Sequence, residues 1–168
     1  EIQDFLRRTS SLDRLCAPLC DAVTGGTGSN KLLKRLEQAN MFLLRLDEKR
    51  EWYRYHQLFS DFLRTECDAG ELQRQHLQAS AWYEANGFEE EAIRHSLAGR
   101  DFPATVRLFR AFADNVLSRG ELSKIRSWLD ELPDELVRAH SDLAGYKSWT
   151  LYLSGQNAQA QPYAQLAR

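Results

Sequence analysis

Three cysteines and four histidines are the side chains of this sequence best suited to binding a metal or acting as nucleophile and base. Cys16 and Cys20 lie four residues apart, which puts both on one side of a helical segment. A zinc site would need two further ligands, and His56 and Cys67 are the candidates. The four positions follow no ligand spacing, so we interpret the thiols as reduced and buried and expect no metal.

The histidines give no sign of a catalytic centre. They stand at positions 56, 76, 95 and 140, scattered over predicted helices and one strand-to-helix junction. No serine or cysteine has a convincing base partner, so we expect no catalytic residue in this sequence and no enzyme activity in this segment.

The glycine-rich loop 25–29 is the only stretch that invites a phosphate-binding interpretation. A P-loop requires Gly-Lys-Ser/Thr, whereas here Asn30 precedes Lys31 and Leu32 follows it. We therefore predict a flexible connector that leads into a helix capped by Asn30, and no nucleotide cofactor held by this segment.

Composition and charge narrow the class of protein. The 168 residues are 43% hydrophobic and 27% charged, with a formal net charge of -2. Residues 1–68 hold 11 Lys/Arg and 11 Asp/Glu, and residues 69–168 hold 11 and 13, so neither part has a basic excess for phosphate contacts. The longest apolar run, Met41–Leu44, is far too short for a membrane span. These features predict a cytoplasmic protein without membrane contact, and the helical pattern at the last residues predicts a segment of a longer chain.

Residues 1–68 show the element order of a winged helix. Apolar residues recur at helical spacing in three segments, and Pro18 predicts either a kink or the start of a helix near it. A strand is predicted over 41–46, a charged turn over 47–51 and a return strand over 52–55. The next helix has an apolar face, and His56 stands at the junction, where a neutral imidazole offers one donor and one acceptor.

A winged helix can bind DNA through its third helix, which here carries Lys31, Lys34 and Arg35. The alternative is that these three cations are the solvated face of an ordinary amphipathic helix. The balanced charge of residues 1–68 favours the second interpretation.

Residues 69–168 lack strand signals and show a repeat. Gly87, Gly120 and Gly155 each follow one helical pattern and precede another, at spacings of 33 and 35 residues. These spacings are close to the 34 of tetratricopeptide repeats, in which antiparallel helix pairs stack. We expect each glycine to end a helix in a left-handed turn. Aromatic residues at helical spacing are candidates for a groove that receives an effector, with repeat core as the alternative: Trp82, Tyr83, Trp128, Tyr146, Trp149 and Tyr152.

Four stretches resemble one family. They are RTSSLDRLCAPLCDAVTG (8–25), LEQANMFLLRLDEKREWYRYHQLFSDFLR (36–64), SAWYEANGFEEEAIRHSLAGRDF (80–102) and WLDELPDELVRAHSDL (128–143). Together they resemble the MalT-like regulators, the large ATP-binding members of the LuxR-type transcription factors. The resemblance implies an N-terminal P-loop ATPase, a winged helix, a helical-repeat sensor arm and a C-terminal helix-turn-helix. This chain matches the winged helix and the start of the repeats.

The resemblance also implies function. In related signal-transduction ATPases a histidine in a Met-His-Asp-Leu pattern touches the phosphates of ADP; here the run is Tyr55-His56-Gln57-Leu58, with glutamine in place of aspartate. The implied role is a regulatory and sensor segment of an ATP-dependent activator. Its implied partners are its own ATPase domain, a small-molecule or protein effector, a second copy on activation, and DNA through the helix-turn-helix. The alternative is a DNA-binding winged helix fused to a tetratricopeptide-like scaffold.

Overall fold

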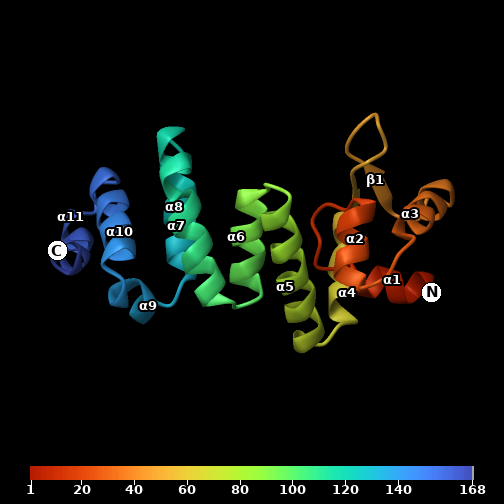
Figure 1. Ribbon diagram of the computed structural model, residues 1–168, viewed down its shortest axis with the longest axis horizontal. Coiled ribbons are helices and arrows are strands. Elements are labelled where there is room, and N and C mark those ends of the chain that lie inside the picture. The colour runs from red at the N-terminus through yellow and green to blue at the C-terminus, as the bar shows by residue number, and fades with distance from the viewer. Residues whose placement is uncertain (168) are drawn as a thin grey trace. The chain divides into compact units, whose positions relative to one another are not determined.

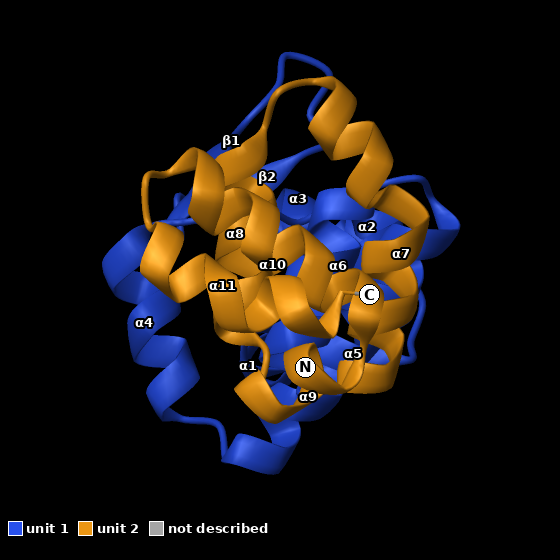
Figure 2. Cartoon of the chain, turned by 90° about the vertical axis from the view of Figure 1, so that its left-hand side faces the viewer, with its two compact units in different colours: residues 1–101 blue, residues 102–168 orange. Residues whose placement is uncertain are grey.

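Helices make up most of the computed structural model, which describes residues 1–167 (Figure 1). The named strands in these residues form one antiparallel hairpin. The predicted class, mainly α with a two-stranded hairpin, is therefore confirmed. Contacts divide the chain into two units, Glu1–Asp101 and Phe102–Arg168, blue and orange in Figure 2. Every helix in the described part of the chain is too short or too polar to cross a lipid bilayer.

The first unit begins with the elements of a winged helix in the predicted order. Their bounds are α1 Ile2–Arg8, α2 Ala17–Thr24, α3 Ser29–Gln38, β1 Leu43–Arg45, β2 Tyr53–Tyr55 and α4 Gln57–Thr65. Strand β1 pairs with β2, and Leu15 makes an isolated antiparallel bridge to Tyr53 with N–O distances of 2.7 and 2.8 Å. Alternation along β2 buries Tyr53 and Tyr55 and turns Arg54 outward.

The starts of α2 and α3 differ in how well the sequence predicted them. Of the two possibilities at Pro18, a new helix is correct: α2 begins at Ala17, with the proline in its first turn, where no amide hydrogen is needed. The cap predicted at Asn30 is wrong, because α3 begins one residue earlier at Ser29. The Ser29 N–H donates to Asp21 Oδ1 at 3.0 Å, so a side chain eight residues away satisfies this end of the helix.

Helices α5 (Ala69–Ala85) and α6 (Glu89–Ala98) complete the first unit as an antiparallel pair. Asp68 caps α5 by accepting the Glu71 N–H at 2.8 Å. Gly87, between the helices, has φ +76, a conformation that other residues rarely adopt, as the repeat pattern predicted.

Gln75 fixes α5 to the winged-helix elements. Its side chain is 3% exposed. Its Nε2 donates to the Arg7 carbonyl at 3.0 Å, and its Oε1 accepts the Ser11 N–H at 3.1 Å and the Ser10 hydroxyl at 3.4 Å. One amide therefore satisfies backbone groups at the end of α1 and in the loop after it. The unit defined by contacts runs to Asp101, and the domain boundary predicted at residue 68 stays a prediction.

Replacing Gln75 with leucine should lower the free energy of unfolding of the first unit by ~1–3 kcal/mol, because the Ser11 N–H would be buried without a partner and the Arg7 carbonyl would lose one of its donors. Urea unfolding followed by circular dichroism measures this loss. Gln78→Leu, at an exposed position of the same helix, is the control and should change stability by about 0.5 kcal/mol or less. Equal effects of the two substitutions would contradict this role for Gln75.

The second unit contains five helices within the described residues. They are α7 Phe102–Ser118, α8 Leu122–Glu131, α9 Asp134–Ala139, α10 Ser141–Leu153 and α11 Asn157–Leu166. Phe109 lies at the centre, fully buried, with its ring 5.2 Å from Tyr146 and 6.4 Å from Trp128. Gly120 and Gly155 separate α7 from α8 and α10 from α11, and both have positive φ, as predicted.

Candidate functional site

His56 lies where strand β2 becomes helix α4. Its N–H donates to the Phe42 carbonyl at 2.7 Å, and its own carbonyl accepts the Phe59 and Ser60 N–H groups at 3.0 Å. These bonds hold the His56 backbone from the strand side and from the helix side. The imidazole itself is exposed, so the chain presents it to solvent from a fixed position.

The imidazole borders a polar hollow of about 550 Å³ in the first unit. The loop before α2, strand β2, helix α4 and helix α6 all contribute to its walls. The charged and polar residues among them are Asp13, Arg54, His56, Gln57, Arg64 and Arg94. Three arginines therefore face one aspartate. The first turn of α4 adds the positive end of a helix dipole. This electrostatic environment favours an anion.

Asp13 holds two of the three arginines. Its Oδ2 is 2.6 Å from Arg94 Nη1 and its Oδ1 is 3.3 Å from Arg64 Nη2. Arg64 also donates from Nε to the Ser10 carbonyl at 3.1 Å, which fixes its plane. Arg54 makes no ion pair or side-chain hydrogen bond within residues 1–167. Arg64 Nη1 is also 3.3 Å from Asp61 Oδ1. The hollow therefore has one unpaired guanidinium and two that share the Asp13 carboxylate, one of which pairs with Asp61 as well.

A second connection joins the same loop to α6. Arg14, next to Asp13, pairs through Nη2 with Glu91 Oε1, and its guanidinium lies over the rings of Trp52 and Phe88 at 4.5 and 5.0 Å. The neighbouring residues Asp13 and Arg14 thus form ion pairs with Arg94 and Glu91, which lie three residues apart on one face of α6. These two ion pairs of opposite polarity fix the register between the winged helix and the helix pair.

Two further histidines form a pair in which His95 is buried and His76 is half-buried. The Nδ1 atoms of His76 on α5 and His95 on α6 are 2.9 Å apart, so one must donate and the other accept. Burial lowers the pKa of His95 to about 3, and the neighbouring His76 and Arg94 act in the same direction. Burial also lowers the pKa of His76, against the attraction of Asp13.

Exposed apolar side chains occupy the same elements as the hollow. Phe42 precedes β1 and stacks on Phe59 at 4.8 Å, yet 57% of its surface is exposed. Leu44 on β1 is 40% exposed, and Leu58 and Phe62 on α4 are 75% and 57% exposed. Exposed apolar side chains of this kind on a small domain are typical of a surface that a partner covers.

The candidate DNA contacts lie on α3. Lys31, Lys34 and Arg35 are all exposed, and Arg35 Nη1 is 3.8 Å from Glu1 Oε2. The structure thus places the three cations on the solvent side of the third helix, which both interpretations required. Contact with DNA stays a prediction.

The six aromatic candidates for an effector groove differ in exposure. Tyr83 is fully buried and Trp128 is 7% exposed. Tyr146 is partly buried and donates to Asp114 Oδ1 at 2.5 Å. Trp149 and Tyr152 are 45% and 63% exposed, and both border a shallow apolar hollow on α10 and α11. Binding of an effector by any of these residues stays a prediction.

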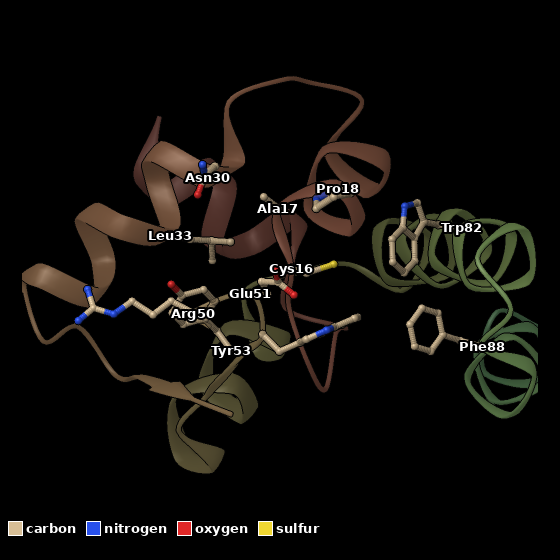
Figure 3. A pocket seen from close by; sticks show the side chains of 11 residues that line it. Cys16, Ala17, Pro18, Asn30, Leu33, Arg50, Glu51, Tyr53, Trp82 and Phe88 are labelled. Atoms are coloured by element: carbon tan, nitrogen blue, oxygen red, sulfur yellow. The ribbon is translucent and has the colours of Figure 1, made fainter. Parts of the chain in front are cut away.

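Trp82 belongs to a second hollow of the first unit, of about 400 Å³ (Figure 3). In Figure 3 the Trp82 and Phe88 rings face Cys16 and Pro18 across this space, and the Arg50 side chain points away from them. The Trp82 and Phe88 rings stack at 5.8 Å, and Trp52 meets Phe88 edge-on at 5.6 Å. The sequence interpretation named Trp82 but missed its two aromatic neighbours.

Two of the three cysteines are buried, and one of these, Cys16, borders the second hollow. Cys16 and Cys20 are buried, and burial raises the pKa of both thiols. Within residues 1–167 no three His, Cys, Asp or Glu side chains gather as a metal site would require. The expectations of no metal and no catalytic residue stay predictions.

A family model matches most of the first unit: the model described as MalT winged helix domain matches residues 1–76. Residues 1–76 are a MalT winged helix domain. The chain is also 30% identical over 154 residues, 90% of its length, to the HTH-type transcriptional regulator MalT of Cronobacter sakazakii. It is 30% identical over 163 residues, 95% of its length, to the serine/threonine-protein kinase PknK of Mycobacterium tuberculosis. The identification as a MalT-like chain is thereby confirmed.

The chain spans 17% of the length of that MalT and 15% of that PknK, so it matches a small part of each. The matched winged helix contains β1, β2, α4 and the exposed imidazole of His56, and it ends within α5. Arg94 therefore lies outside the residues matched by the MalT winged helix model, although its guanidinium borders the same hollow.

The arginines of the hollow were not found from the sequence. Arg54 is two residues before His56, and strand alternation could have placed it on the outer face. Asp13, Arg64 and Arg94 are separated by 51 and 30 residues along the chain, and no local pattern connects them.

Proposed function

We propose that this chain is the regulatory segment of an ATP-dependent, LuxR-type transcriptional activator. In this proposal the MalT winged helix domain covers an ATPase domain of the same protein and contributes His56 to the phosphates of bound ADP. The observation that carries it is the exposed His56 imidazole, fixed at the junction of β2 and α4 beside three arginines. An imidazole N–H can donate to a phosphate oxygen, and the surrounding positive charge favours the bound anion.

The exposed apolar residues support the same partner. Phe42, Leu44, Leu58 and Phe62 lie on the elements that also line the hollow, so a domain that supplies the nucleotide could cover them at the same time. Their burial would favour the closed state through the hydrophobic effect. Release of the nucleotide phosphates would remove the His56 contact and shift the population towards an open state.

The helix pairs of the second unit would then receive a small-molecule or protein effector and bias this opening. The exposed Trp149 and Tyr152 beside an apolar hollow support that role. Self-association and promoter binding through a C-terminal helix-turn-helix complete the proposal, by resemblance to MalT-like regulators. Coupling between effector and nucleotide is then a difference in affinity between the two states.

Retention of ADP by the intact protein tests the role of His56. We expect His56→Ala to speed ADP release by roughly tenfold, the effect of losing one hydrogen bond to a charged group. The measurement is the ADP that remains bound after gel filtration, together with its dissociation rate. His140→Ala, at a half-buried histidine of the second unit, is the control and should leave retention unchanged. ADP retention unaffected by His56→Ala would remove this residue from the nucleotide site.

A DNA-binding role is the second candidate, favoured by the exposure of Lys31, Lys34 and Arg35 on α3. The equal numbers of acidic and basic residues in 1–68 oppose it. A gel shift of this chain with duplex DNA at low salt separates the two, and we expect no retardation. Retardation that disappears when the three cations are replaced by alanine would establish DNA binding by α3.

A further inference from the structure

The carboxylate of Asp13 occupies a position that an external anion could take. It lies between Arg64 and Arg94, and the side chains of Asp13 and Arg94 are each 49% exposed. Because these groups border an open hollow of about 550 Å³, a ligand can reach the guanidinium groups without unfolding the domain. Arg54 faces the same hollow and is not neutralised by any described carboxylate.

We propose that this hollow binds a phosphate or pyrophosphate group between Arg54, Arg64 and Arg94, and that the anion replaces Asp13 on Arg94. The inference deepens the proposed function, on which it rests for the choice of a phosphate as the anion. A phosphate carries more negative charge than one carboxylate and offers several acceptor oxygens to the planar guanidinium groups. Two guanidinium groups already positioned by Asp13 need little rearrangement to accept it.

The replacement has a structural consequence. Asp13 is in the loop before α2 and Arg94 is on α6, so their ion pair joins the winged helix to the helix pair. The ion pairs Arg14–Glu91 and Arg7–Glu71 join the same two parts and do not involve the hollow. Anion binding therefore replaces the Asp13–Arg94 ion pair between the winged helix and α6 with a contact to the ligand. Occupancy of the hollow is in this way coupled to the first helix pair, beyond the residues matched by the family model.

Isothermal titration of this chain with pyrophosphate at low salt tests the proposal. We expect millimolar or tighter binding that weakens as salt is added. Asp13→Asn should tighten it by roughly two- to fivefold, because it removes a competing charge from a partly exposed pair. Arg94→Gln and Arg54→Gln should each weaken it by a similar factor, and Arg94→Lys should weaken it less. Arg74→Gln, at an exposed position of α5 outside the hollow, makes the same charge change and should have no effect.

Circular dichroism at the titration temperature shows that each variant is folded. Absence of pyrophosphate binding by the native chain would overturn the proposal. So would Asp13→Asn that leaves affinity unchanged, or Arg74→Gln that weakens binding as much as Arg94→Gln. Parallel titrations with sulfate and ADP identify the source of the anion: equal affinity for sulfate would overturn a phosphate site, and equal affinity for ADP and pyrophosphate supports recognition of the diphosphate alone.

The two proposals fail separately. If pyrophosphate binds as described while His56→Ala does not change ADP retention in the intact protein, the anion site stands and the role of His56 is wrong. If ADP retention depends on His56 but Arg54→Gln and Arg94→Gln bind pyrophosphate as the native chain does, the role of His56 stands and the anion site is wrong.

Discussion

Replacing Phe109 with alanine should lower the free energy of unfolding of the second unit by ~3–5 kcal/mol. The ring is fully buried and lies edge-on to both Trp128 and Tyr146, at 6.4 and 5.2 Å. Its removal leaves a cavity between α7, α8 and α10, which these helices cannot fill without shifting towards it and disturbing their other contacts. Hydrogen–deuterium exchange in peptides from α7, α8 and α10 measures the loss, because exchange from fully protected amides reports the unfolding free energy.

Phe112 offers a matched control on the same helix. It is only partly buried, so Phe112→Ala should cost roughly 1 kcal/mol. Equal losses for the two substitutions would show that Phe109 is not the centre of this unit. Binding of pyrophosphate to the hollow of the first unit should be unchanged in both variants, because none of its lining residues belongs to the second unit.

Acid should destabilise the first unit through the His76–His95 pair. The two Nδ1 atoms, 2.9 Å apart, share one hydrogen, and His95 is 2% exposed, so a second proton there costs both a hydrogen bond and the burial of a charge. Asp13, Arg64 and Arg94 face the pair from the loop before α2, from α4 and from α6. The two arginines oppose a positive charge on either ring and Asp13 attracts it to His76.

The direction of the pH effect follows from the lowered pKa values. In the unfolded chain a histidine takes up a proton near pH 6.5, whereas burial lowers the pKa of folded His95 to about 3. Its neutral form therefore stabilises the fold above pH 6.5, and this contribution is lost as the pH falls from 6.5 towards 3. At about 1.4 kcal/mol for each pH unit, we expect a loss of about 2 kcal/mol between pH 7 and pH 5 from His95 alone.

Urea unfolding at pH 7 and pH 5 measures this loss, in the native chain and in His95→Phe. Phenylalanine fills a similar volume beside the Tyr83 ring, 5.2 Å from that of His95, and cannot take up a proton. We expect His95→Phe to remove most of the difference between the two pH values, even if it lowers stability at both. His140→Gln, in the second unit, is the control and should keep the full difference. A native chain equally stable at pH 7 and pH 5 would contradict the prediction.

Local patterns predicted much of this fold correctly. Gly87, Gly120 and Gly155 end helices in left-handed turns because a missing Cβ is a property of the residue itself. The hairpin and the position of His56 at its junction with α4 followed from a change of hydrophobic period, which is also local. Asn30 was misplaced because the side chain that satisfies α3 is Asp21, in the preceding helix, rather than a cap at the helix end.

Contacts between residues far apart in the sequence could not be predicted from such local patterns. Nothing in the local sequence distinguished Gln75 from other polar residues of its helix, yet its side chain forms hydrogen bonds with backbone groups more than 60 residues away. Tyr83 and Trp149 both looked like members of an aromatic stripe, and only packing makes the first fully buried and the second 45% exposed. The tetratricopeptide type of the helix pairs stays a prediction.

By itself the sequence determined the order of the elements, the glycine turns between helices and the position of the histidine at the end of the hairpin. The tertiary structure decided what surrounds that histidine. Arg94 joins Asp13 and Arg64 only because α5 and α6 pack against the winged helix. The physical reason is that periodicity records which face of a helix is apolar, whereas the charges that meet across two elements depend on the angle and register at which those faces pack.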